Sequence, residues 1–187
     1  KLFTVRGSFA YNFPFPKAAD AKIVRQVRFA TLDAHNGSAT AITSSKEDTD
    51  QALTHDDKSA IKTFARQLLE LAPSLTKDRP AGSRIIVRAA SWSALATLQP
   101  LLAGSEQTNA VLIHEQVGKG DNRKLHPLRF VTVREAQMKA GGAIFWLHQT
   151  KLLEGIDDPM FVAVAILDGF TNDRQLVQQI GRVLRST

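Results

Sequence analysis

The run RIIVRAA at residues 84–90, followed by the helical pattern WSALATLQPLL at residues 92–102, decides the fold class. The first run has the length of a strand and is almost continuously apolar, as strands are when both faces of their sheet are covered. A buried strand followed by a helix and another buried strand forms a right-handed β-α-β unit with parallel strands. We therefore expect a parallel sheet in this part of the chain.

Three further apolar runs repeat the pattern downstream. They are NAVLIH at residues 109–114, AIFWLH at residues 143–148 and FVAVAIL at residues 161–167. A glycine-bearing, charged loop is expected over residues 116–126, and a short helix over residues 132–140 that is closed by two glycines. The alternation of strands and helices predicts a three-layer α/β domain, in which a mostly parallel sheet is flanked by helices.

The first 79 residues differ from the rest of the chain. Asp56, followed by apolar residues at helical spacing, predicts a helix over residues 57–71 that ends before Pro73. Residues 1–56 mix alternating aromatic residues, basic residues and a polar stretch, which predicts an arm or edge strand and a loop. We expect residues 1–79 to form an arm or linking segment and residues 80–187 to form the domain.

The composition limits the class of protein. The 187 residues are 43% apolar and 22% charged, which suits one globular domain with a core of ordinary size. No apolar run approaches the roughly 18 residues of a membrane span, and no signal-peptide pattern is present. The absence of cysteine excludes disulfides and thiolate metal sites and permits a reducing compartment, so we expect a cytoplasmic protein without a membrane partner.

The charge favours an anionic partner. The net charge is +6 and the isoelectric point is about 9.8, which suits nucleic acid or a nucleotide. The chain starts at Lys1 rather than at a methionine and stops after an arginine-bearing segment. We expect it to be a piece of a longer polypeptide.

The last residues, TNDRQLVQQIGRVLRST at 171–187, predict a helix with two stripes. Its apolar stripe consists of Leu176, Val177, Ile180, Val183 and Leu184. Its second stripe consists of Gln178, Gly181, Arg182 and Arg185. A glycine inside a helix costs about 1 kcal/mol relative to alanine, and the gap it leaves beside two guanidinium groups suits an anionic ligand. A solvated face with a chance glycine is the alternative.

The pattern Q-x-x-G-R-x-x-R at residues 178–185 resembles motif six of superfamily-2 helicases and translocases, most closely the version in restriction-enzyme-type DNA translocases. The resemblance implies that Arg182 and Arg185 are arginine fingers that reach the γ-phosphate of ATP on another domain. It implies that Gln178 couples the two arginines to the nucleotide.

Two further segments carry the same resemblance, in the order that the family has. Gly155-Ile156-Asp157 in TKLLEGIDDP resembles motif five and implies nucleotide contacts by Gly155 and Asp157, although a plain turn is the alternative. IIVRAAS resembles motif four and implies that Arg88 and Ser91 contact phosphates of the nucleic acid. The same comparison implies a phosphate contact by Thr150. The resemblance covers about residues 80–187 and implies the second RecA-like motor domain of a helicase.

The chain departs from the family in one important way. It contains neither the Walker A sequence G-x-x-x-x-G-K-S/T nor a D-E-x-H or D-E-A-D tetrad. ATP and Mg²⁺ are therefore expected to be held mainly by a first RecA-like domain that this chain does not include. The expected partners are that domain and DNA, with RNA not excluded.

Two other classes of function stay open. A Rossmann-like module could use the basic helix to hold nucleic acid or phosphate without ATP chemistry. A free-standing hydrolase could use His114-Glu115 and His148, which leave neighbouring strand ends. The five histidines show no metal-ligand spacing such as H-x-x-x-H, so no metal site is expected.

Overall fold

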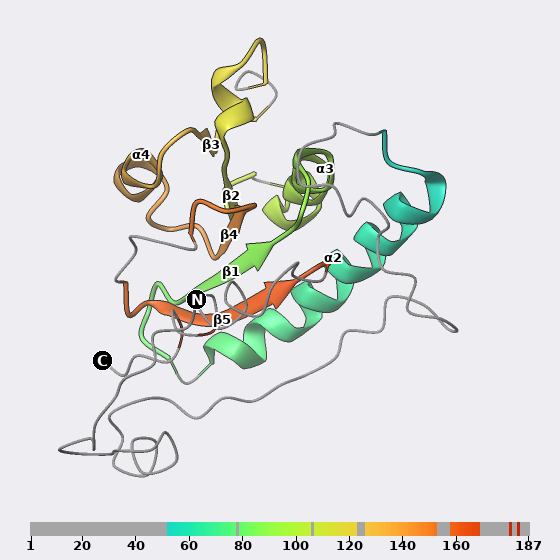
Figure 1. Cartoon of the computed structure of the whole chain (residues 1–187). Helices are drawn as coiled ribbons and strands as arrows, with labels where there is room; N and C mark the ends of the chain where they lie inside the picture. Colours follow the sequence, from blue (N-terminus) through green and yellow to red (C-terminus); the bar gives the residue numbers. More distant parts are fainter. Residues whose placement is uncertain are drawn as a thin grey trace, which may run out of the picture.

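The computed structural model describes residues 52–77, 79–105, 107–122, 126–152 and 158–168, together with Ile180 and Val183. Nine helices and strands are assigned within these ranges (Figure 1). In chain order they are α2 (His55–Thr76), β1 (Arg84–Arg88), α3 (Trp92–Ala103), β2 (Ala110–Ile113), the 3-10 helix η1 (Glu115–Gly118), β3 (Arg129–Phe130), α4 (Val133–Lys139), β4 (Phe145–His148) and β5 (Phe161–Ile166).

The five strands form one sheet in the order β3-β2-β4-β1-β5, and every neighbouring pair is parallel. Helices α2 and α3 cover one face of the sheet and α4 covers the other (Figure 1). The predicted three-layer α/β fold is therefore confirmed, and its arrangement is one that RecA-like and Rossmann-like domains share.

Burial on both faces explains the continuous apolar runs in the sequence. Successive strand residues point to opposite faces, so Ile85 and Val87 lie in the core beneath α2 and α3, whereas Ile86 lies in the core beneath α4. Val183, from the arginine-bearing segment, also packs against the α4-side core. Its backbone N–H donates to the Ile180 carbonyl at 3.1 Å.

Helix α2 is longer than the helix predicted over residues 57–71: it begins two residues earlier and ends five residues later. It begins at His55 because Thr54 and Asp57 form a reciprocal capping box. The Thr54 hydroxyl accepts from the Asp57 N–H at 3.1 Å, and the Asp57 carboxylate accepts from the Thr54 N–H at 2.9 Å. The prediction that Asp56 caps the helix was therefore wrong.

The helix also continues through Pro73 to Thr76. A proline inside a helix forfeits one backbone hydrogen bond, and here that loss falls near the end of the helix, on an exposed residue. The apolar face of α2 packs on the same core as α3 and the sheet. This segment of the expected linking region is thus an outer layer of the described fold.

The other expected elements match the structure closely, with two omissions: strand β3, and the 3-10 helix η1 at the start of the expected loop over residues 116–126. Strand β3 was not predicted, since two residues are too few to show a pattern. Residues 1–51 of the expected arm and all of the predicted C-terminal helix except Ile180 and Val183 lie outside the described residues. Within the described ranges, no helix combines the length and the apolar character needed to cross a bilayer.

Candidate functional site at the carboxyl ends of the strands

The carboxyl ends of parallel strands meet at one edge of a sheet, which is where ligands bind in open α/β folds. Strand β1 leads there to Ala90 and Ser91, and β2 leads to His114. Strand β4 leads to Gln149 and β5 leads to Asp168. The side chains at this edge are joined to one another by hydrogen bonds.

Ala90 is held on both of its backbone polar groups. Its N–H donates to Asp168 Oδ2 at 2.5 Å, and its carbonyl accepts from Gln149 Nε2 at 2.6 Å. The end of β1 is therefore tied to the ends of both neighbouring strands, β5 and β4, through side chains.

Arg88 and Asp168 form a buried ion pair beside Ala90. Arg88 Nη1 lies 2.9 Å from Asp168 Oδ1, and the two side chains are only 2% and 6% exposed. Burial raises the pKa of the Asp168 carboxyl above its usual value, while the Ala90 N–H and the Arg88 guanidinium act in the opposite direction. Separating the two side chains would leave each charge buried without its partner, which costs free energy. Each side chain therefore holds the other in position.

His114 extends these contacts to the next strand. Its Nδ1 accepts from the Gln116 N–H at 3.0 Å, so the proton of a neutral ring lies on Nε2. Nε2 lies 2.7 Å from Gln149 Oε1 and donates to it. We call the connected set the strand-end relay; its members are Gln116, His114, Gln149, Ala90, Asp168 and Arg88.

A surface ion pair lies beside the strand-end relay. Lys151 Nζ lies 2.5 Å from Glu115 Oε1 and joins the loops that follow β4 and β2. The hydrogen bond from Lys151 and its charge hold the pKa of the Glu115 carboxyl below its usual value. Because Glu115 is exposed, solvent screens this pair and its contribution to stability is small.

Three of the predicted site residues lie at this edge. The Ser91 hydroxyl accepts from the Ala94 N–H at 3.2 Å and caps α3, and Ser91 is half-buried. Thr150 is exposed directly after Gln149. Arg88 is buried in its ion pair, so the phosphate contact expected of Arg88 would require that pair to open.

The other predicted site residues lie outside the described ranges. They are Gly155, Asp157, Gln178, Arg182 and Arg185. Their segments are continuous with the described edge, since the first follows β4 and the second follows β5.

Sequence reasoning missed Gln149 and Asp168. Asp168 directly follows the apolar run of β5, and a carboxylate at the end of a buried strand is a usable signal. Gln149 carries no such signal, because its partner Ala90 is 59 residues away in the chain.

A second polar cluster lies under the edge strand β3. Gln99 of α3 is 0% exposed, and its Nε2 donates to the Leu128 carbonyl at 3.0 Å. Its Oε1 accepts from Arg129 Nε at 2.7 Å. His126 Nδ1 lies 3.1 Å from Gln99 Nε2. Burial lowers the pKa of both His126 and Arg129, and the nearby Arg129 charge adds to the effect on His126. This cluster attaches the edge strand to α3.

The histidines proposed for a hydrolase have structural contacts. His148 is 0% exposed, and its Nδ1 accepts from the Leu152 N–H at 3.3 Å. Both nitrogens of His114 are engaged within the strand-end relay. Among the described residues, no group of three or more His, Cys, Asp or Glu side chains could hold a metal ion.

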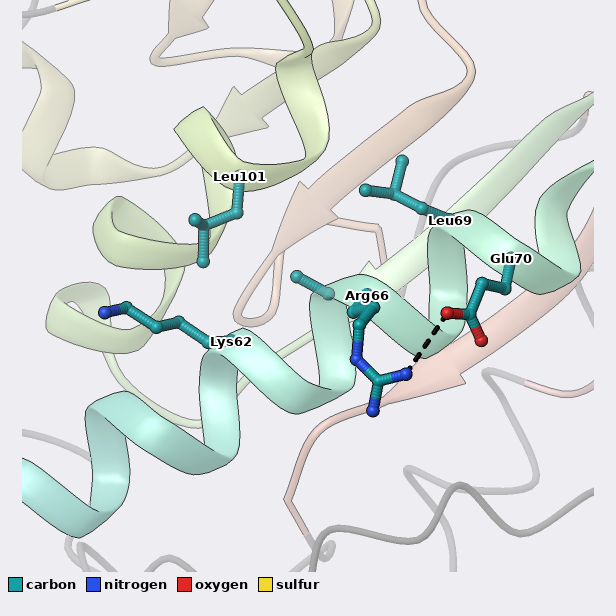
Figure 2. A pocket seen from close by; sticks show the side chains of 6 residues that line it. Lys62, Arg66, Leu69, Glu70 and Leu101 are labelled. Carbon is teal, nitrogen blue, oxygen red and sulfur yellow. Dashed lines mark hydrogen bonds and ion pairs between the residues drawn. The ribbon is translucent and has the colours of Figure 1, made fainter.

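An open groove lies elsewhere, between α2 and α3 (Figure 2). It has a volume of about 420 Å³ and a mostly apolar lining. The exposed ion pair between Arg66 and Glu70, at 3.2 Å, lies on one side of it. Leu101 lines the groove from the last turns of α3, at the opposite end of that helix from the Ser91 cap. The groove is therefore separate from the strand-end site.

No protein-family model, curated protein or solved structure matches the chain.

Proposed function

We propose that the chain is the second motor domain of an ATP-dependent superfamily-2 DNA helicase or translocase. One observation supports this most directly. The segment that resembles motif four covers most of β1 and the turn after it, and the segments that resemble motifs five and six come after β4 and β5 in the chain; these three strands are adjacent and parallel in the sheet. The carboxyl ends of these strands thus meet at one edge of the sheet, as a shared nucleotide and nucleic-acid site requires.

In this proposal Arg182 and Arg185 reach the γ-phosphate of ATP on the first motor domain, and Gln178 couples them to the nucleotide. Gly155 allows close backbone approach, and Asp157 accepts hydrogen bonds or orients the arginines. ATP with Mg²⁺ supplies the phosphoryl group, and this chain has no P-loop to hold it. An arginine finger is worth about 10³ to 10⁵ in rate.

Ser91 and Thr150 hold the nucleic-acid backbone, so binding is sequence-tolerant and weakens with salt. DNA is the proposed substrate, with RNA as an outcome of the same binding test. The proposed compartment is the cytoplasm.

The experiment uses the polypeptide in which this chain is joined to a P-loop domain. Arg185→Ala is expected to lower ATP hydrolysis by about 10³-fold or more while nucleic-acid binding stays within about twofold. Arg134→Ala, at an exposed position of α4, is the matched control and is expected to keep wild-type hydrolysis. Wild-type turnover by Arg185→Ala would refute the proposal.

A second candidate, a phosphate- or nucleic-acid-binding module without ATP chemistry, is favoured by the absence of any P-loop in a chain with a net charge of +6. It predicts that the chain alone binds nucleic acid tightly and that Arg185→Ala weakens that binding. The same pair of measurements therefore separates the two candidates.

A further inference from the structure

Arg129 is a nearly enclosed positive charge without a negative partner. Its side chain is 4% exposed, and among the described residues no carboxylate forms an ion pair with it. Burial lowers the pKa of its guanidinium, and no neighbouring carboxylate acts against this effect. Charges inside proteins are normally paired, because enclosing an isolated charge costs free energy. An anionic ligand would supply the missing partner.

The sequence around Arg129 does not supply a carboxylate. Residues 122–129 read NRKLHPLR and contain no acidic residue. Asp121, which precedes this stretch, is exposed and does not pair with Arg129. His126 adds a donor, because its Nδ1 accepts from the Leu128 N–H at 3.1 Å and the proton of the neutral ring lies on Nε2, which has no partner. The cluster therefore has unused donors, which suits an anion.

Three contacts hold the Arg129 guanidinium in one orientation. Its Nε donates to Gln99 Oε1 at 2.7 Å, and its Nη1 donates to the Asn122 carbonyl at 3.0 Å. Its carbon lies 5.4 Å from the centroid of the Trp92 ring, which is within the range of a cation–π contact. Nη2 has no acceptor among the described residues and is not fully enclosed. It is therefore a fixed, charged donor that reaches the surface.

We propose that Arg129 Nη2 binds a phosphate group of single-stranded nucleic acid. The strand that Ser91 and Thr150 hold then continues past the end of β2 to β3. This inference rests on the nucleic-acid part of the proposed function, to which it adds a binding residue. A guanidinium is suited to this role, because it stays charged at neutral pH even when burial lowers its pKa, and its N–H groups match the geometry of phosphate oxygens.

Described contacts connect Arg129 to the other proposed phosphate-binding positions. Ser91 directly precedes Trp92, whose ring contacts Arg129 and lies 5.1 Å from the His114 ring, measured between centroids. In the strand order β3-β2-β4-β1, His114 follows β2 and so lies between Arg129 on β3 and Thr150 after β4. The proposed binding surface thus extends from the ends of β1 and β4 to the edge strand.

The test is Arg129→Met in the polypeptide that carries the P-loop domain, with a fluorescent oligothymidylate as the probe and without ATP. The Kd is expected to rise about tenfold, because a charge-assisted hydrogen bond to phosphate is lost. The slope of log Kd against log salt concentration is expected to fall by about 0.7, the contribution of one phosphate of a single strand. Arg134→Met makes the same change at an exposed position of α4 and should alter the Kd by less than about twofold.

Two further variants separate a phosphate contact from a structural role. Arg129→Lys keeps the charge but loses the planar fork that bonds Gln99 and Asn122, and it is expected to keep the wild-type salt slope. An equal loss of slope in Arg129→Lys and Arg129→Met would make the role structural and overturn the inference. If Arg129→Met does not fold, Arg129→Gln replaces it, since its amide can still donate to Gln99 while the charge is removed.

Inorganic phosphate distinguishes the two sources of the anion. If phosphate raised the Tm of the wild type but not that of Arg129→Met, and both bound the oligonucleotide equally, the site would be one for free phosphate and the inference would be overturned. An unchanged Kd and salt slope in Arg129→Met would overturn it as well. Both results leave the proposed function intact where the wild type hydrolyses ATP. A wild type that binds through Arg129 but hydrolyses no ATP would refute the motor and keep the contact.

Discussion

Arg88 and Arg129 are both strand residues and nearly equally buried, at 2% and 4% exposed, yet their partners differ. Arg88 pairs with the Asp168 carboxylate. Arg129 has neutral partners: Gln99 Oε1 at 2.7 Å, the Asn122 carbonyl at 3.0 Å and the Trp92 ring, whose centroid lies 5.4 Å from the guanidinium carbon. Among the described residues, no carboxylate pairs with Arg129.

The comparison shows how strand position decides the partner. Arg88 lies on β1, between two other strands, and the carboxylate comes from the end of the next strand. Arg129 lies on the edge strand β3 and receives an amide from α3. An arginine near a strand end is therefore not by itself a phosphate ligand, because the fold can supply its partner.

The largest effect is expected from Arg88→Met in the chain itself. It strands the Asp168 carboxylate in a buried place, so the free energy of unfolding should fall by about 3–5 kcal/mol in urea denaturation. The double variant Arg88→Met/Asp168→Leu removes both charges and should recover most of the loss. A loss of less than about 1 kcal/mol for Arg88→Met would show that the pair contributes no more than an exposed ion pair does.

The same variant has a predicted pH dependence. Burial raises the pKa of Asp168 in the folded state, so the folded chain binds this proton more readily than the unfolded chain. The contribution of this group to stability is then largest below its unfolded pKa and is lost as pH rises through the folded pKa. Arg88 lowers the pKa of Asp168 in the folded state, so this pKa should be higher in Arg88→Met. The free energy of unfolding that is lost as the pH rises should therefore be larger in this variant.

The next effect is expected from Gln99→Leu. It removes the acceptor of Arg129 Nε and the donor to the Leu128 carbonyl, and leaving buried polar groups unsatisfied costs about 1–3 kcal/mol each. We expect a total loss of about 2–3 kcal/mol by urea denaturation, because water can reach part of the site after the change. Gln137→Leu, at an exposed position of α4, should lose no more than about 0.5 kcal/mol.

Arg129→Met should cost less than Arg88→Met, about 1 kcal/mol, because it removes hydrogen bonds to neutral acceptors but also removes a desolvated charge. No carboxylate is stranded by the change. Equal losses for Arg129→Met and Arg88→Met would show that partner charge does not separate the two sites, and the comparison would then be wrong.

The pattern of predicted and missed features has a physical basis. Strands β1, β2, β4 and β5 could be predicted because burial on both faces leaves a continuous apolar run. Strand β3 could not, because it has only two residues and one of them, Arg129, has its side-chain partner Gln99 30 residues away in the chain. The start of α2 was missed because Asp56, Thr54 and Asp57 are all capable caps, and only the reciprocal bonds select Thr54.

The candidate site was predicted less completely than the fold. The motifs placed Ser91 and Thr150 at the strand ends, where the structure has them. The internal partner of Arg88 was not predictable, since Asp168 lies 80 residues away and no local pattern links the two. Long-range hydrogen bonds depend on strand order, which the sequence pattern does not specify.

The smallest effect is expected from His126, in the same cluster as Arg129. Burial and the Arg129 charge lower the pKa of His126, so the unfolded chain binds this proton more readily than the folded chain. The stability contributed by this group is therefore complete above the unfolded pKa, about 6.5, and is lost as pH falls from there through the lowered folded pKa. This dependence on pH is opposite in sign to that of Asp168.

His126→Asn tests this dependence. In the wild type, the Leu128 N–H donates to His126 Nδ1 at 3.1 Å. The amide oxygen of the variant can still accept this hydrogen bond, but the side chain no longer titrates. The free energy of unfolding, measured by urea denaturation between about pH 5 and pH 7, should then rise less steeply with pH than in the wild type. An unchanged slope would mean that His126 titrates alike in the folded and unfolded chain, and the two polar clusters would no longer differ in sign.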